Sequence, residues 1–193
     1  MSGSERLWYF AYGANMARAV LVRRGVHPSQ SSAATLAGYA LRFAHPGLPP
    51  LEPVFATVVP AAGATVQGVA HHITTTEAAL FDSFEPGYHR VAVQVELVAG
   101  TLVPAFAYVS DEPGAAAVPS ARYLGLLIDG AREYQLPAHF IAGLEALRGA
   151  ASTASQGRLS TAALAGLHER ALGAHLPADL VAEWLRDSAG STE

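Results

Sequence analysis

The sequence predicts an α+β protein, in which a small mixed, mainly antiparallel β-sheet closes or nearly closes into a barrel with flanking helices. Two observations predict this fold. Six segments have the composition of strands, and most follow one another through short turns, as in hairpins. Segments with helical spacing are inserted between the strands and follow them. Because 51% of the 193 residues are hydrophobic, the chain can bury a core without disulfides or metal ions.

The chain is predicted to open with a strand, a tight loop and a short helix. Leu7 to Tyr12 form an aromatic, β-favouring run that stops at Gly13. Met16 to Arg24 then have a helical pattern, which Gly25 closes.

Three more strands are predicted before residue 74. Leu36 to Ala44 and Val54 to Val59 are strand-like, and we expect the proline-rich stretch between them, Pro46 to Pro50, to be a loop. Ala61-Ala62-Gly63 is interpreted as a hairpin turn into a strand from Thr65 to Ile73.

A short helix is predicted after these strands. Thr74 and Glu77 have the spacing of a capping box, in which each side chain bonds the backbone N–H of the other residue. The helix should begin there and run to about Phe84, because Pro86 and Gly87 stop it.

The clearest hairpin and two further helices follow. Val91 to Leu97 alternate apolar and polar residues, and a turn at Ala99-Gly100 leads into a strand from Leu102 to Val109. Helices are then predicted to begin at Pro119-Ser120 and at Leu136-Pro137.

The chain is predicted to divide into a main domain, residues 1–148, and an appended segment, residues 149–193. The first part of this segment, 149–158, is rich in Ala, Ser, Gly and Thr and is interpreted as a linker. Two amphipathic stretches, at about 160–171 and 177–187, should form a C-terminal helical extension that docks on the main domain or on a second subunit.

Two features of the main domain can carry chemistry. Tyr12 to Asn15 lie where a strand gives way to a helix, so that successive backbone N–H groups can point at one anionic group; an ordinary turn has the same composition. Glu85 places a carboxylate at the apolar end of a short helix, which suits a general base and acid; a solvated helix-terminal glutamate is the alternative.

Composition argues against several classes of partner. The formal net charge is −4 and no run of like charges occurs, which disfavours nucleic acid and anionic membranes. The chain has no cysteine, so it has no disulfide, thiolate metal site or cysteine nucleophile, and it is compatible with a reducing cytoplasm. We expect a soluble, unprocessed protein, because no leader pattern and no apolar run of the ~18 residues needed to span a membrane occurs.

Metal and nucleotide chemistry also lack a motif. His71 and His72 are adjacent and would point to opposite faces of a strand, and His168 and His175 are seven residues apart. No His-Glu-x-x-His pattern, Gly-x-Ser-x-Gly elbow, Walker loop or Gly-x-Gly-x-x-Gly fingerprint is present. We therefore predict no metal site and no cofactor.

Residues 9–16, Tyr-Phe-Ala-Tyr-Gly-Ala-Asn-Met, resemble the opening motif of the γ-glutamylcyclotransferase family, Tyr-Phe-Ala-Tyr-Gly-Ser-Asn-Met/Leu. Further matches, in the family's order, extend the resemblance from residue 7 to about residue 147. They are Gly38-Tyr39-x-Leu-x-Phe43, Ala56-Thr57-x-Val-x-Pro60, Val66-x-Gly68-Val69, Phe81-Asp82-x-x-Glu85, Tyr88-x-Arg90, Ala107-Tyr108-Val109, Pro119-Ser120-x-x-Tyr123, Gly130-Ala131 and Leu136-Pro137.

The resemblance implies a γ-glutamylcyclotransferase-like barrel with a substrate pocket, in which Glu85 is the catalytic residue. The pocket residues that it implies are Tyr9, Phe10, Ala11, Tyr12, Gly13, Ala14, Asn15, Tyr88 and Tyr123. Ala14 stands where the family has serine, which removes a hydroxyl from the loop but none of its backbone donors. The segment from Glu85 to Tyr88 is shorter than in many relatives, which leaves the shape of that pocket wall open.

The implied activity is that of a cyclotransferase, a metal-independent acyltransferase that converts a γ-glutamyl amino acid or amine into 5-oxoproline and the free amine. The nucleophile is the substrate's own α-amine. Three alternatives stay open: removal of a γ-glutamyl protecting group from a biosynthetic intermediate, hydrolysis of another small amide, and a non-catalytic small-molecule binding protein of the same fold. We expect a small-molecule γ-glutamyl substrate, no nucleic-acid or membrane partner, and a cytoplasmic location, with a homodimer left open.

Overall fold

The computed structural model describes residues 5–48 and 52–154. Within them, five strands form a closed barrel in the order β1-β3-β2-β4-β5. The strands are β1 (Arg6–Ala11), β2 (Gln30–Leu48), β3 (Glu52–Thr74), β4 (Tyr88–Leu97) and β5 (Leu102–Ser110). The pair β1–β5 is parallel, and the other four pairs of neighbours are antiparallel. The predicted mixed, mainly antiparallel barrel is confirmed.

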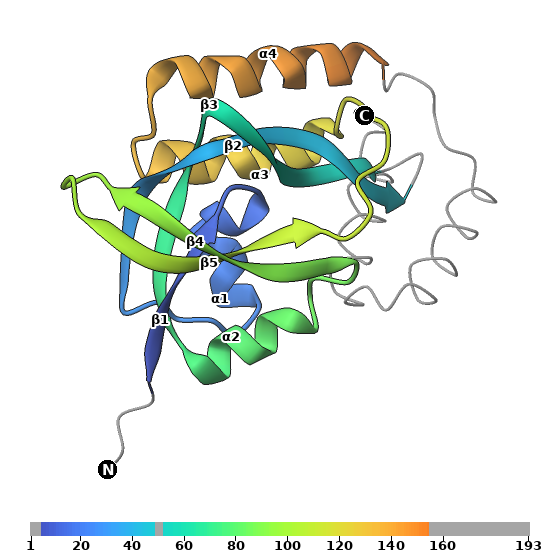
Figure 1. Cartoon of the computed structure of the whole chain (residues 1–193). Helices are drawn as coiled ribbons and strands as arrows, with labels where there is room; N and C mark the ends of the chain where they lie inside the picture. Colours follow the sequence, from blue (N-terminus) through green and yellow to red (C-terminus); the bar gives the residue numbers. More distant parts are fainter. Residues whose placement is uncertain (1–4, 49–51, 155–193) are drawn as a thin grey trace.

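The helices cover the barrel from two sides (Figure 1). They are η1 (Ala14–Met16, a short 3-10 turn), α1 (Arg18–Arg23), α2 (Thr75–Asp82), α3 (Ala121–Glu133) and α4 (Ala138–Ala154). α3 and α4 lie side by side on one side of the barrel, and α2 lies on the opposite side. Apolar side chains of α3, including the fully buried Leu124, Leu127 and Ile128, join those of the barrel in one core.

The predicted hairpin turn at Ala61-Ala62-Gly63 is wrong, because β3 continues through it. Ala37 pairs with Thr65 and Tyr39 pairs with Pro60, so that four residues of β3 face one residue of β2. This is a bulge, which lets a strand bend without ending. Gly63 takes a φ of 76° inside the bulge, a backbone conformation that glycine adopts at little cost. Two predicted strands thus merge, and six candidates become five strands.

The predicted loop at Pro46 to Pro50 is also wrong in its first part. β2 begins earlier than expected, at Gln30, and runs through Pro46, which pairs with Val54, as far as Leu48. Only Ala34 and Thr35 of β2 pair with β4, so the second edge of β2 near Pro46 takes no ladder hydrogen bond from that strand. Proline, which lacks a backbone N–H, is tolerated at such an edge.

Local capping signals are confirmed. Thr74 and Glu77 form both hydrogen bonds of a capping box at the start of α2, and Ser120 caps α3 by accepting from the N–H of Tyr123. The expected helix at Met16 to Arg24 is divided into η1 and α1. The β4–β5 hairpin forms as expected.

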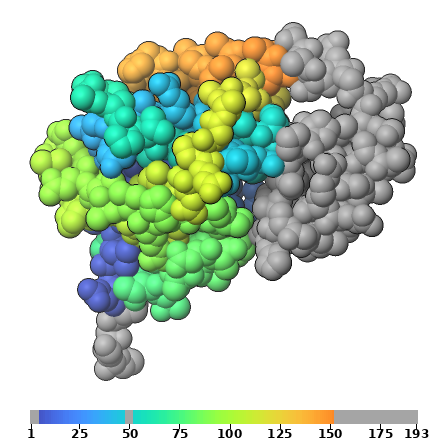
Figure 2. Space-filling model, turned by 45° about the vertical axis from the view of Figure 1, so that its right-hand side comes forward, coloured from blue at the N-terminus to red at the C-terminus, as the bar shows by residue number. Residues whose placement is uncertain are grey.

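The segment between β5 and α3 crosses over β2 (Figure 2). The N–H of Gly114 donates to the carbonyl of Ala44 and that of Ala117 donates to Phe43. This crossing brings the end of β5 and the start of α3 to the same end of the barrel.

The last described helix, α4, is longer than predicted. It ends at Ala154, so the first six residues of the expected linker, 149–154, are helical. The remaining linker and both expected C-terminal helices, at about 160–171 and 177–187, lie outside the described residues. Among the described helices, none combines the length and the apolar character that crossing a membrane requires.

Candidate active site

A cavity of about 780 Å³ lies where the loop after β1 meets the end of β2, the start of β3, the α2–β4 turn and the N-terminal turn of α3. Of the residues predicted for the site, eight line this cavity: Tyr9, Tyr12, Gly13, Ala14, Asn15, Glu85, Tyr88 and Tyr123. Residues 70 or more positions apart in the chain are thus brought together in one place.

Phe10 and Ala11, the other two residues predicted for the pocket, do not line the cavity. Both are buried in the core, with exposed fractions of 0% and 1%. Successive side chains of a strand point to opposite faces, so Phe10 is turned away from the face that Tyr9 presents. The carbonyl oxygen of Ala11 packs close against Gly68 of β3.

Glu85 is held by two donors on one of its carboxylate oxygens. The Asn15 side-chain amide donates to Glu85 Oε1 at 2.9 Å, and a guanidinium nitrogen of Arg24 donates to the same atom at 2.7 Å. The side chain of Glu85 is 15% exposed. No hydrogen bond reaches Oε2 from the part of the chain that the structure describes, so this oxygen is left for a molecule in the cavity.

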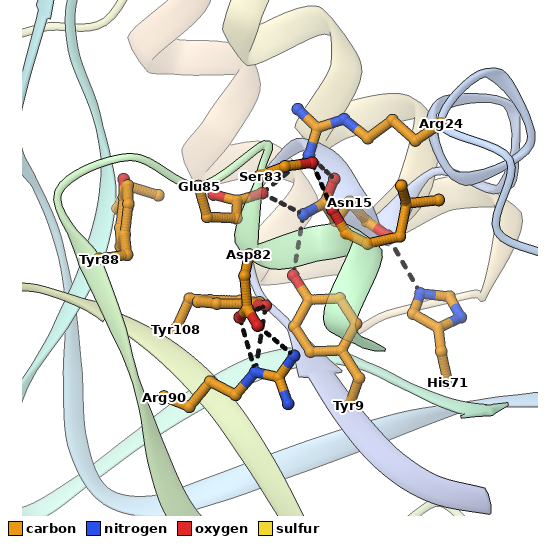
Figure 3. A network of polar contacts seen from close by, with 12 residues as sticks. Tyr9, Asn15, Arg24, His71, Asp82, Ser83, Glu85, Tyr88, Arg90 and Tyr108 are labelled. Atoms are coloured by element: carbon orange, nitrogen blue, oxygen red, sulfur yellow. Dashed lines mark hydrogen bonds and ion pairs between the residues drawn. The ribbon is translucent and has the colours of Figure 1, made fainter. Parts of the chain in front are cut away.

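Asn15 lies at the centre of a polar network (Figure 3). Its side-chain amide also donates to the Tyr9 hydroxyl at 2.8 Å, and its Oδ1 accepts from Arg24 at 3.0 Å. Its backbone carbonyl lies 3.1 Å from Nε2 of the fully buried His71, whose Nδ1 lies 2.8 Å from the Ser31 hydroxyl. A carbonyl only accepts, so the hydrogen is assigned to Nε2 and the serine donates to Nδ1.

Burial keeps His71 uncharged. It lowers the pKa of His71 to about 4, against the smaller opposing effect of the Asn15 carbonyl. At neutral pH the imidazole is therefore neutral, which fits a ring that donates from one nitrogen and accepts at the other.

The cavity is surrounded by tyrosine hydroxyls that burial keeps protonated. Desolvation raises the pKa of Tyr9, Tyr12, Tyr88 and Tyr123 above the ordinary value of a phenol. Each of these groups is therefore a neutral hydroxyl at physiological pH.

Two of these hydroxyls already have acceptors. Tyr12 donates to the carbonyl of Tyr108, and Tyr88 donates to the carbonyl of Ala56 at 2.8 Å. The hydroxyl oxygens of Tyr9 and Tyr123 instead accept hydrogen bonds, the latter from the Ala56 N–H at 3.1 Å. Within residues 5–48 and 52–154, no acceptor is found for their own hydroxyl hydrogens, which leaves two neutral donors at the cavity.

The loop passes close beneath one of these donors. A Cβ atom added at Gly13 would lie 2.9 Å from the Tyr123 hydroxyl oxygen. Glycine at this position therefore lets the loop backbone lie close to the Tyr123 hydroxyl without a steric clash. Ala14, the next residue, also lines the cavity.

Asp82 belongs to a different cluster from Glu85. Arg90 donates to both of its carboxylate oxygens at 2.8 and 2.9 Å, and the Tyr108 hydroxyl donates to it at 2.8 Å. Asp82 does not line the cavity, and its side chain is 55% exposed. These contacts fasten α2 to the β4–β5 hairpin.

The described part of the chain contains no group of three or more His, Asp or Glu side chains arranged to hold a metal ion. The absence of a metal requirement stays a prediction.

Comparison with known proteins decides the family. The family model described as "Gamma-glutamyl cyclotransferase, AIG2-like" matches residues 9–125, more than half of the chain. The chain belongs to this family.

Two curated relatives carry the same description. Gamma-glutamyl cyclotransferase gliK of Aspergillus fumigatus is 29% identical over 160 residues, which are 66% of this chain and 57% of that protein. Gamma-glutamyl cyclotransferase aclK of Aspergillus oryzae is 29% identical over 161 residues, which are 70% of this chain and 59% of that protein. The chain thus spans less than two thirds of the length of these relatives.

Solved structures show the same fold. A structure described as gamma-glutamyl cyclotransferase superimposes with a TM-score of 0.66 at 20% identity, covering 86% of this chain and 99% of that one. The human protein loc79017 superimposes with a TM-score of 0.64 at 24% identity, covering 74% of this chain and 88% of that one. The γ-glutamyl cyclotransferase fold is therefore shown for this chain.

Sequence reasoning missed three residues of the site. Arg24 was assigned only to a helix end, His71 was weighed only as a metal ligand, and Ser31 was not singled out. Each joins the site through a contact between residues 40 or more positions apart in the chain, which no local pattern encodes. The one available signal was composition, since an arginine and a histidine in largely apolar segments need partners.

Proposed function

We propose that this protein converts a γ-glutamyl amide into 5-oxoproline and a free amine, with Glu85 as general base and acid. In this reaction the α-amine nitrogen bonds to the γ-carbonyl carbon, and the amide C–N bond breaks. The observation that carries the proposal is the Glu85 carboxylate, which lines the cavity with Oε1 bonded to Asn15 and Arg24 and with no partner on Oε2 in the described chain.

Glu85 can serve both proton transfers. Its Oε2 takes a proton from the substrate's α-ammonium, which frees the nitrogen lone pair for attack. The same oxygen then returns this proton to the departing nitrogen, so that the amine leaves neutral. The attacking nitrogen gives up its second proton to water as the ring forms, which leaves the lactam N–H of 5-oxoproline. Asn15 and Arg24 keep the carboxylate in one orientation through both steps, because they bond only Oε1.

The negative charge that develops on the γ-carbonyl oxygen requires donors. The hydroxyl hydrogens of Tyr9 and Tyr123 are neutral donors without acceptors in the described chain, and both hydroxyls sit at the cavity. Preorganised donors of this kind lower the barrier because they need no reorientation as charge appears. Gly13, Ala14 and Asn15 line the same cavity, and we assign the α-carboxylate to the backbone donors of this loop.

Proximity supplies much of the rate. The nucleophile and the carbonyl belong to one molecule, and holding them in a reactive conformer is worth about 7–11 kcal/mol of barrier. Neither a metal ion nor a covalent enzyme intermediate is then needed. We place the reaction in the cytoplasm, with which a cysteine-free chain is compatible.

The direct test is to incubate the protein with a panel of γ-glutamyl amino acids and amines and to measure 5-oxoproline by mass spectrometry. At least one compound should yield 5-oxoproline and amine in equal amounts. A matched N-acetylated substrate should be inert, because its nitrogen is no longer a nucleophile. Release of free glutamate, or cleavage of the acetylated compound at a similar rate, would identify a hydrolase instead.

Metal independence has its own test. Turnover should survive exhaustive treatment with a chelator, because the proposed steps use only side chains and backbone donors. Loss of turnover in chelator, with recovery on adding zinc or manganese, would contradict the metal-free reaction.

A further inference from the structure

One side of the cavity is a row of aromatic rings. Tyr123, Phe55, His45 and Tyr88, which we term the aromatic wall, all line it. Resting on the cyclotransferase function proposed above, we infer that this wall receives the leaving amine, and that the substrates are γ-glutamyl amides of amines bearing an aromatic ring.

The rings of the wall contact one another in sequence. The Phe55 and Tyr123 rings meet edge to face with centroids 5.2 Å apart, and the His45 ring stacks on Tyr88 at 3.9 Å with an interplanar angle of 28°. His45 and Phe55 link the two pairs at 6.3 Å. The rings come from α3, β3, β2 and β4, so four elements converge on one surface. Phe55, His45 and Tyr88 are only partly buried, and all three line the cavity.

The position of the wall relative to Glu85 assigns it to the leaving group. The N–H of Tyr88 donates to the backbone carbonyl of Glu85 at 3.2 Å, so a tight turn joins the first residue of the wall to Glu85, and both side chains line the cavity. The scissile nitrogen must lie at this carboxylate to receive its proton. A group attached to that nitrogen can extend along Tyr88 towards His45, whereas the charged glutamyl part needs the polar loop at Gly13.

The ring at the far end of the wall is an uncharged imidazole. His45 is fixed through Nδ1, which lies 2.9 Å from the Ser110 hydroxyl, and burial lowers its pKa to about 4, so the ring is neutral at physiological pH. Asp111 and Glu112, which follow Ser110, also line the cavity and are acidic. Asp111 is paired with Nδ1 of His89 at 2.7 Å, and Arg23, Arg24 and Arg122 also line the cavity, so charges of both signs surround the wall. The rings of the wall are themselves uncharged, which suits the ring of an aromatic amine.

The size of the cavity fits a substrate larger than a γ-glutamyl group. Cavities of 300–1,000 Å³ are typical of sites that enclose drug-sized molecules. The glutamyl part is no larger than one amino acid and fills only a fraction of about 780 Å³. The remaining space, bounded by the aromatic wall, accommodates a ring on the amine.

The experiment compares two substrates that differ only in a ring. Initial rates of 5-oxoproline release are measured for γ-glutamyl phenethylamide and γ-glutamyl ethylamide with the unchanged protein. Burying the phenyl group should raise kcat/KM roughly 10–100-fold for the phenethylamide. γ-Glutamyl cyclohexylethylamide, which has a ring of similar size without π-electrons, should be clearly poorer than the phenethylamide, because the wall stacks flat rings.

Variants then locate the preference. Phe55→Leu should reduce the phenethylamide-to-ethylamide ratio of kcat/KM by roughly 3–10-fold. Tyr39→Leu removes a half-buried aromatic ring of β2 that does not line the cavity, and it should leave the ratio unchanged.

The outcomes separate the two proposals. Equal kcat/KM for phenethylamide and ethylamide, or for phenethylamide and cyclohexylethylamide, overturns the aromatic-amine inference while 5-oxoproline release still supports the cyclotransferase. Absence of 5-oxoproline from every compound overturns the cyclotransferase and the inference with it. If Tyr39→Leu lowers the phenethylamide-to-ethylamide ratio of kcat/KM as much as Phe55→Leu does, the preference does not arise at the aromatic wall.

Discussion

Asn15 uses its entire side-chain amide within the site. Its nitrogen donates to Tyr9 and Glu85, and its oxygen accepts from Arg24. The partners fix the orientation of the amide, because a flipped group would turn its N–H bonds towards the guanidinium of Arg24. A glutamate held by a residue whose hydrogen bonds are all used has few orientations, which suits the role of general base that we propose for Glu85.

Replacing Glu85 with glutamine is the most direct single-residue test of the site. The volume and the polar contacts are nearly kept, but the titrating group is lost, so Glu85→Gln should lower kcat by about 10²–10⁴-fold and KM should change much less. Steady-state kinetics on an active substrate measures this. Asp82→Asn is the matched control, since Asp82 bonds Arg90 outside the cavity. Near-parental kcat in Glu85→Gln, with loss in Asp82→Asn, would contradict the assignment.

Tyr123 offers a second prediction. Removing its hydroxyl takes away a donor for the developing oxyanion, so Tyr123→Phe should lower kcat by roughly 10²-fold, which is near the lower end for loss of one such donor. Tyr88→Phe is a close control, because it also loses one hydrogen bond to the backbone of Ala56. The Tyr88 hydroxyl already has an acceptor, so its loss should reduce kcat less. Equal losses in the two variants would mean that Tyr123 acts through the structure of Ala56 rather than on the substrate.

Among the helices and strands, local sequence signals predicted the caps and the hairpin correctly. They did not predict where the long strands β2 and β3 begin, bend and end. The capping box at Thr74 and the β4–β5 hairpin depend on contacts between residues close in the chain, and both were correctly predicted. The bulge at Gly63 and the extension of β2 through Pro46 depend on which strand lies opposite. Glycine and proline mark turns in most contexts, so local patterns alone place a turn where the barrel instead bends a continuous strand.

The site residues also fall into two groups, those that a sequence motif predicts and those that only the fold reveals. Glu85, Tyr88, Tyr123 and the loop residues stand in motifs that resemble a known family, and the structure brings these residues to one cavity. Phe10 and Ala11 stand in the same motif but are buried in the core, because strand alternation and depth decide which residues reach the cavity. The supporting contacts of Arg24 and His71 arise only after folding.

The capping box of α2 lends itself to a measurement of stability. Thr74→Ala removes the oxygen that accepts from the Glu77 N–H at 3.1 Å, and it should lower the free energy of unfolding by about 1 kcal/mol. Urea denaturation followed by circular dichroism measures the change. The same substitution one residue later, Thr75→Ala, alters an exposed position inside the helix and should be nearly neutral or slightly stabilising. Equal destabilisation by both would refute the contribution of the cap.

At the scale of the whole molecule, the buried His71 couples stability to pH. Its pKa falls from the ordinary value of 6.5 to about 4 in the folded protein, chiefly through burial, and Arg18 acts in the same direction. Between these two values the unfolded chain binds the proton and the folded chain does not. Stability from this group is therefore fully present above pH 6.5 and is lost as the pH falls towards 4. Glu52, whose pKa burial raises, acts in the opposite sense at acidic pH.

A variant that cannot titrate isolates the contribution of His71. The shift corresponds to about 3 kcal/mol, most of which should be lost between pH 7.5 and pH 4.5. His71→Gln keeps a polar group that can bond the Asn15 carbonyl, but it cannot take up the proton. Between pH 7.5 and pH 4.5 the free energy of unfolding of the parent should therefore fall by about 2–3 kcal/mol more than that of the variant. Urea denaturation at several pH values measures both curves, and His139→Gln, at an exposed position of α4, should follow the parent. Parallel curves for the parent and His71→Gln would show that His71 is protonated in the folded protein, and the neutral link between Ser31 and Asn15 would then be wrong.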